Sequence, residues 1–138
     1  TPKSFRSSYG RLRWPVAGTV INRYGKYTDE NGQTVDSRGI DIEANYGEPV
    51  RVVFAGQVTL ADYVRGYGQT VAVKHGQYTT IYAHLNGIRV RKGQQLEEGD
   101  VVGLVGNTGL TDGDGYMLTF EIRYNSRAQN PGPWLSPE

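Results

Sequence analysis

Cysteine is absent from this sequence, and histidine occurs only twice in 138 residues, as His75 and His84. The absence of cysteine excludes disulfide bonds and thiolate metal sites. A tetrahedral zinc site could be assembled only from the two histidines and carboxylates, and their spacing does not indicate one. No apolar run reaches the roughly 18 residues that a membrane-spanning helix needs. The sequence therefore predicts neither a disulfide framework nor a transmembrane segment.

Strong charge and helical periodicity are also lacking. The chain has 15 lysines and arginines against 14 aspartates and glutamates, a formal net charge of +1. This balance gives no general electrostatic case for binding nucleic acid or an anionic membrane. No segment shows a sustained apolar period of about 3.6 residues with capping signals. A hydrophobic content of 37% and 19 glycines instead indicate a globular chain with many tight turns.

Short apolar, β-branched stretches separated by glycine turns organise most of the chain. We expect strands at 49–55, 57–63, 69–74, 78–85, 101–105 and 118–124, and a hairpin or exposed loop at 26–36. This pattern predicts a single all-β domain, a sandwich or barrel, over residues 14–138. Residues 1–13 are polar and basic. They are expected to form a flexible lead-in arm, with a docking role as the alternative.

Alternation along two strands identifies candidate polar residues. Asp41 lies between Ile40 and Ile42, so its side chain is expected on the face opposite the two isoleucines. It is then either a carboxylate in a groove or an ordinary turn cap. Tyr82 and His84 are two residues apart on one strand and are expected to face the same side. Both line a groove if that side is solvated, whereas His84 is a hydrogen-bonded buried histidine if that side is core.

Several short motifs follow one another in a characteristic order between Trp14 and Leu135. They are Gly39-Ile40-Asp41-Ile42, Gly66-Tyr67-Gly68, Tyr82-Ala83-His84-Leu85, Gly106-Asn107-Thr108-Gly109, Phe120-Glu121-Ile122-Arg123, Asn130-Pro131 and Trp134-Leu135. In order and spacing, this set resembles the LytM/lysostaphin-type metallopeptidases of family M23. The resemblance implies an antiparallel β-sandwich, built on the duplicated hybrid motif, with a groove across one sheet.

The residues at the family's metal-binding positions depart from its pattern. In that family the first metal segment reads His-x-Gly-x-Asp and the second reads His-Leu-His-Phe. Here Ser37 stands in place of the first histidine, and Met117 and Thr119 stand in place of the later pair. Asp41 alone remains of the usual zinc ligands, and His84 matches a catalytic histidine. The resemblance therefore implies a degenerate site with no catalytic residue, no bound metal and no cofactor.

The run from Ala61 to Gly68 and the ending of the chain resemble in particular the EnvC-type activators of cell-wall amidases. This resemblance implies a regulatory domain, periplasmic or in the cell envelope, that activates a zinc amidase (an N-acetylmuramoyl-L-alanine amidase) in cell-wall remodelling or cell division. Asp41 and His84 are kept here, although such activators often lose them. The predicted partner-binding groove consists of Arg38, Asp41, Tyr67, Tyr82, His84, Thr119 and Arg123.

Two other functions stay open at this point. The groove could hold a peptidoglycan peptide without cutting it, which would make the domain a peptidoglycan-binding module. A residual zinc endopeptidase would need Asp41, His84 and an unexpected further ligand. If these residues have no binding role, Arg38 and Arg123 are solvated charges at strand edges, and the 10 tyrosines reflect the preference of tyrosine for strands.

Overall fold

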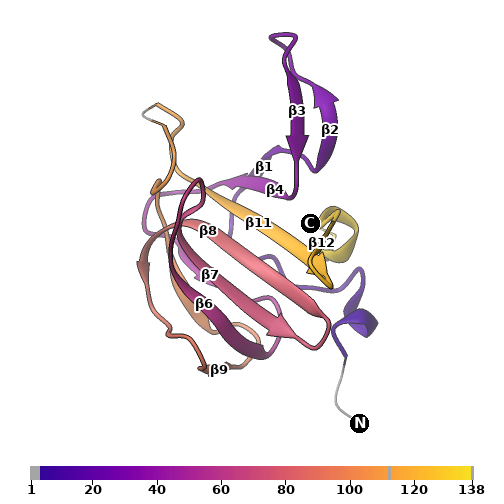
Figure 1. Cartoon of the computed structure of the whole chain (residues 1–138), viewed down its shortest axis with the longest axis vertical. Helices are drawn as coiled ribbons and strands as arrows, with labels where there is room; N and C mark the ends of the chain where they lie inside the picture. The colour runs from indigo at the N-terminus through magenta and orange to yellow at the C-terminus, as the bar shows by residue number, and fades with distance from the viewer. Residues whose placement is uncertain (1–3, 112, 138) are drawn as a thin grey trace.

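The computed structural model describes residues 4–111 and 113–137, and antiparallel strands are its main elements (Figure 1). The strands of its main sheet are β1 (Thr19–Asn22), β4 (Ile40–Glu43), β5 (Pro49–Arg51), β6 (Gly56–Val64), β7 (Gly68–His75), β8 (Tyr78–Ile88), β9 (Gln95–Leu96), β10 (Val101–Val105), β11 (Met117–Tyr124) and β12 (Arg127–Gln129). The sheet runs in the order β1-β4-β11-β8-β7-β6-β9, while β10 pairs with β5 and β8, and β12 pairs with β11. The predicted all-β antiparallel class is confirmed.

Helices are few and short in the described residues. They are two 3-10 turns, η1 (Arg6–Ser8) and η2 (Gly132–Trp134). Within 4–111 and 113–137, no helix has the length and apolar character needed to cross a membrane.

A separate hairpin stands off from the main sheet at the top of Figure 1. It consists of β2 (Gly25–Thr28) and β3 (Thr34–Ser37), so of the two alternatives expected at 26–36, a hairpin or an exposed loop, the hairpin forms. Asp29 closes its turn, because Oδ1 accepts the backbone N–H groups of Asn31 and Gln33, each at 2.9 Å. The second strand ends at Ser37, so the base of the hairpin leads directly into β4.

The hydrophobic core gathers side chains from one face of the central strands, from β5 and β10 and the residues beside them, and from both chain ends. The side chains that meet there are mostly β-branched or aromatic, which suits a pleated, half-buried surface. Its fully buried members are Ile42, Val50, Val52, Val53, Val71, Val73, Tyr82, Leu85, Val102, Val105, Leu118, Phe120 and Ile122. Burying each such side chain stabilises the fold by about 1.5–3 kcal/mol. Because one face of β4 and β11 is buried in this core, only the opposite face of the two strands is available for binding.

The N-terminal segment is packed against this core. Phe5 and Leu12 are only 3% and 2% exposed. The N–H of Leu12 donates to the carbonyl of Trp134 at 3.1 Å, and the N–H of Ser136 donates to the carbonyl of Leu12 at 2.8 Å. The expected flexible arm at 1–13 is therefore wrong for residues 4–13, because two apolar side chains anchor an otherwise basic segment. Residues 1–3 lie outside the described part of the chain.

His75, at the end of β7, is part of a buried chain of hydrogen bonds. Its Nδ1 lies 2.9 Å from the carbonyl of Ala55, which can only accept, so Nδ1 carries the proton. Nε2 then accepts from the Thr80 hydroxyl at 2.8 Å. Thr80 Oγ1 lies 2.8 Å from the Tyr82 hydroxyl, which accepts the N–H of Val53 at 3.1 Å. Burial lowers the pKa of His75 to about 4. The ring is therefore a structural histidine.

Mild acid is expected to destabilise the domain through His75. Its pKa is about 4 in the folded chain and about 6.5 in the unfolded chain, so below pH about 6.5 the unfolded chain binds more protons. The stabilising contribution is complete above that pH and is lost as the pH falls towards 4. We expect the free energy of unfolding in urea to fall by about 2 kcal/mol more in the wild type than in His75→Gln between pH 7 and pH 5. Equal losses in the two proteins would contradict this assignment.

Candidate functional site

The two segments that resemble metal-binding segments lie side by side. β4 pairs with β11 in antiparallel register and places Asp41 opposite Thr119. Ile40 and Ile42 are buried in the core, and Asp41 projects from the other face, as alternation predicted. Thr119 Oγ1 donates to Asp41 Oδ1 at 2.6 Å, and Asn22 Nδ2 donates to Asp41 Oδ2 at 2.8 Å. Both carboxylate oxygens of Asp41 are thus engaged by neighbouring donors.

The remaining side chains at the metal-ligand positions are poor zinc ligands. The Ser37 hydroxyl donates to the carbonyl of Gly39 in its own turn at 2.8 Å. Thr119 offers only a neutral hydroxyl, which donates to Asp41. Met117, at the position that the resemblance gives to a catalytic histidine, offers a thioether and is 7% exposed. Zinc in proteins is held instead by imidazole, thiolate and carboxylate groups. Among the residues that the structure describes, no group of three or more His, Cys, Asp or Glu could hold a metal ion. The residues present therefore do not fit the zinc centre that a metallopeptidase fold implies.

Tyr82 and His84 do not share a face of β8. The strand is bulged between them, because Tyr82 pairs with Val71 while Leu85, three residues on, pairs with Gln69. His84 has a φ of 64° at this bulge. Tyr82 is fully buried in the core. The prediction that Tyr82 lines the groove is wrong, because the extra residue of a bulge breaks the two-residue alternation on which it relied.

His84 connects the turn at Tyr67 to the loop at Thr108. Its backbone N–H donates to the carbonyl of Tyr67 at 2.7 Å. Its Nδ1 lies 2.8 Å from the carbonyl of Thr108, which can only accept, so Nδ1 carries a proton and donates. The side chain is 6% exposed. His84 therefore fixes the turn that carries Tyr67.

A buried carboxylate, Glu121, organises the face of β11 that lies away from the core. It is 2% exposed, and its Oε2 accepts the Tyr67 hydroxyl at 2.6 Å. Its Oε1 accepts Nε and Nη2 of Arg123 at 2.9 and 2.7 Å. A Cβ at Gly39 would lie 2.7 Å from Glu121 Cγ and 2.3 Å from the carbonyl oxygen of Phe120, so only glycine fits there. Glu121 and Arg123 are two residues apart on a strand, the one sequence signal that could have identified this pair.

Tyr67 and Arg123 are held in fixed orientations by this carboxylate. Burial raises the pKa of the Tyr67 phenol above its ordinary value, and the hydrogen bond to Glu121 raises it further. The phenol therefore stays protonated and donates. Arg123 Nη2 also approaches the Tyr67 hydroxyl at 3.3 Å, which closes the triangle of the three side chains. The ring of Tyr67 and the guanidinium of Arg123 are therefore already ordered, so a partner that binds them loses little side-chain entropy.

Thr119, Glu121 and Arg123 alternate along β11 and project from one face, which we call the groove face. In the next strand, Ala83 lies opposite Thr119 and Ile81 lies opposite Glu121. Both are buried, but they lie outside the main hydrophobic cluster. Asp41, Tyr67 and Arg38 complete the groove face at its margins.

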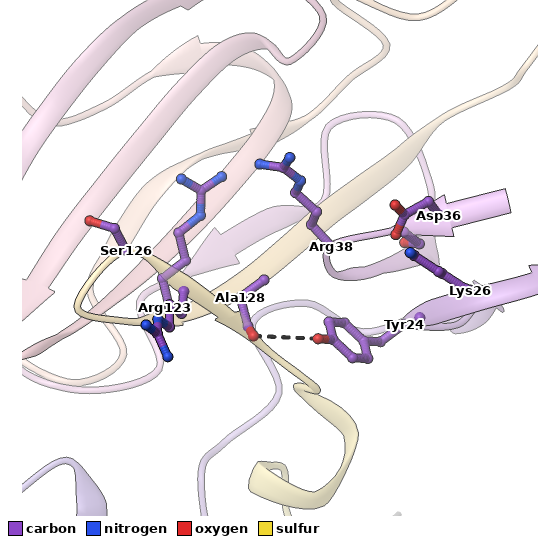
Figure 2. Close-up of a pocket in the computed structure, with 10 residues that line it drawn as sticks. Tyr24, Lys26, Asp36, Arg38, Arg123, Ser126 and Ala128 are labelled. Carbon is purple, nitrogen blue, oxygen red and sulfur yellow. Dashed lines mark hydrogen bonds between the residues drawn. The ribbon is translucent and has the colours of Figure 1, made fainter.

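In Figure 2 the guanidinium of Arg38 extends towards that of Arg123. The structure thus brings together Arg38, Asp41, Tyr67, Thr119 and Arg123, with His84 holding the Tyr67 turn. Their contact with a partner stays a prediction.

The fold and the groove face define a protein built like a zinc peptidase, in which Thr119 at one ligand position bonds to Asp41 at another and Ser37 at the third bonds to its own turn. The sequence matches peptidase family M23 over residues 35–131, so the chain belongs to this family. The predicted resemblance to LytM/lysostaphin-type domains is confirmed.

Relatives in sequence and in structure agree with this assignment. The chain is 37% identical over 128 residues to "Murein hydrolase activator EnvC" of Escherichia coli, covering 91% of this chain and 29% of that protein. It is 35% identical over 137 residues to "Lipoprotein NlpD/LppB homolog" of Pseudomonas aeruginosa, covering 98% and 43%. The catalytic domain of lysostaphin from Staphylococcus simulans superposes with a TM-score of 0.74 at 25% identity, covering 85% and 91%. The chain spans less than half the length of both sequence relatives.

Removing the buried carboxylate tests the Glu121 network. In Glu121→Ala, the Tyr67 hydroxyl and the Arg123 guanidinium lose their shared acceptor. Since hydrogen bonds to charged groups contribute about 1.5–3 kcal/mol, we expect the free energy of unfolding in urea to fall by about 3 kcal/mol. The matched control is Glu98→Ala, an exposed glutamate whose loss should change stability by less than about 0.5 kcal/mol. A similar, small effect of both substitutions would show that the network does not stabilise the fold.

Restoring the missing ligands tests whether the two segments still form a metal-site frame. Ser37→His combined with Thr119→His would return the family's ligand set beside Asp41. We expect this double variant to retain about one zinc ion per chain after dialysis, measured by elemental analysis, and the wild type to retain none. Adding Asp41→Asn should abolish the uptake. Failure of the double variant to take up zinc would mean that the segments have lost the family's spacing as well as its side chains.

Proposed function

We propose that this domain is a catalytically inactive regulator that binds and activates a peptidoglycan hydrolase during cell-wall remodelling or cell division. The observation that carries the proposal is the state of Asp41, the one ligand kept from the family's set. Its two oxygens accept from Thr119 and Asn22, and the two other ligand positions of the family hold Ser37 and Thr119. Three protein ligands and an open position are the usual minimum for a catalytic zinc. The name of the Escherichia coli relative, a murein hydrolase activator, supports the same function.

The partner proposed here is a zinc amidase, an N-acetylmuramoyl-L-alanine amidase, that contacts the groove face. Tyrosine and arginine are enriched among the residues that dominate binding energy at protein interfaces. On the groove face, Glu121 fixes both Tyr67 and Arg123 before a partner arrives. Rigid, pre-oriented side chains lose less entropy on binding, which favours affinity.

A place in the cell envelope follows from the same proposal. The Pseudomonas aeruginosa relative is named a lipoprotein, and the Escherichia coli relative is named for its action on a murein hydrolase. A regulator of such a hydrolase has to meet it where peptidoglycan is, which in a bacterium with an outer membrane is the periplasm.

Binding to a purified zinc amidase, measured by titration calorimetry, tests the proposal. We expect Arg38→Ala, Tyr67→Ala and Arg123→Ala each to weaken binding by about 30-fold, which corresponds to about 2 kcal/mol at an interface hot spot. Arg91→Ala is the control, since Arg91 is exposed in a loop away from the groove face. Circular dichroism would confirm that each variant is folded. Wild-type affinity in all three groove variants would contradict the proposed surface, and the absence of wild-type binding would contradict the proposed partner.

A further inference from the structure

A pocket of about 510 Å³ opens beside the groove face, between the base of the β2–β3 hairpin and the turn from β11 to β12 (Figure 2). Its charged lining residues are Lys26, Asp36, Arg38, Arg123 and Arg127. The Tyr24 hydroxyl donates to the carbonyl of Ala128 at 3.3 Å and ties the base of the hairpin to β12. The two walls of the pocket are therefore connected rather than independent. We call this hollow the basic pocket.

The basic pocket has more positive charge than its own acidic groups neutralise. Glu121 already pairs with Arg123 at 2.7 Å, and this is the only ion pair within residues 4–111 and 113–137. Asp36, directly across the hairpin from Lys26, is the one carboxylate in the lining. Lys26, Arg38 and Arg127 are exposed. Three cations outside any ion pair thus face one carboxylate, a surplus that favours an anionic ligand.

We propose that the basic pocket receives acidic side chains from the segment of the hydrolase that occupies the groove, so that this segment carries aspartate or glutamate at the end nearer the hairpin. The inference rests on the proposed function and adds the chemistry of the partner. Guanidinium groups match carboxylates with two parallel hydrogen bonds, and an ammonium adds a point charge. Lys26 and Arg127 are specificity residues in this account, and neither belongs to the groove predicted from the sequence.

Continuity between the two surfaces favours a protein segment as the ligand. Arg38 and Arg123 line the basic pocket and also border the groove face. A chain lying along the groove face therefore reaches the basic pocket without a break. Because Arg123 is held by Glu121, the cations available to the ligand are Arg38, Lys26 and Arg127. Exposed charges at the rim of an interface act mainly on the rate of association and on its dependence on salt.

Association kinetics with a purified zinc amidase test the proposal. We expect Lys26→Glu combined with Arg127→Glu to slow association about tenfold at low ionic strength, with the difference shrinking at high ionic strength. The matched control is Arg91→Glu combined with Lys92→Glu, which changes the net charge equally in an exposed loop outside the pocket. This control should associate much more like the wild type.

Each other outcome overturns the assignment in a recognisable way. If the pocket variant associates like the wild type, the basic pocket does not contact the partner, although the proposed function stands. An equal effect of the control variant would mean that net charge alone is responsible. If the wild type fails to bind the amidase but binds purified sacculi, and the pocket variant loses that binding, the ligand is a carboxylate of peptidoglycan, and the proposed function fails with the proposed partner.

Discussion

The antiparallel pairing of β4 with β11 is the constraint on which the functional face depends. It sets Asp41 against Thr119 and brings the turn at Gly39 so close to Phe120 and Glu121 that a Cβ cannot fit. The same register buries Ile40 and Ile42 in the core, so that the polar side chains of both strands are left on the opposite face. One register thus decides both the packing of the core and the composition of the groove face.

The side chains of this face bond to one another rather than standing ready for a metal. Thr119 and Asn22 satisfy Asp41, and Tyr67 and Arg123 satisfy Glu121. No buried polar side-chain atom in the described residues lacks a hydrogen-bond partner. The polar side chains of this face therefore have their hydrogen bonds satisfied within the domain. Such a surface offers shape and directed hydrogen bonds to a partner. A hydrolytic site would instead need an open position for a nucleophilic water.

Local patterns in the sequence predicted much of the fold but less of the candidate site. Glycine turns and β-branched runs predicted the all-β class and a hairpin or exposed loop at 26–36, and alternation placed Asp41 correctly. The same alternation placed Tyr82 wrongly. The bulge at His84 inserts an extra residue that shifts the alternation, and no local sequence pattern indicates this bulge.

Other features depend on contacts between segments far apart in the chain. The anchoring of Phe5 relies on His75, Tyr78 and Trp134. The Glu121 network requires the turn at Tyr67, more than 50 residues away in the sequence. The basic pocket likewise joins the hairpin to β12. Such clusters are set by the topology of the sheet, which a single sequence does not specify directly.

The most direct test of the central claim is release of dye from labelled sacculi, measured for the domain alone and for the domain mixed with a zinc amidase of the same organism. An activator that has lost its own zinc site should release nothing by itself and should increase release by the amidase. Release by the domain alone would contradict the account, since the groove face would then carry hydrolytic chemistry. Unchanged release in the mixture would also contradict it and would favour a domain that only binds peptidoglycan.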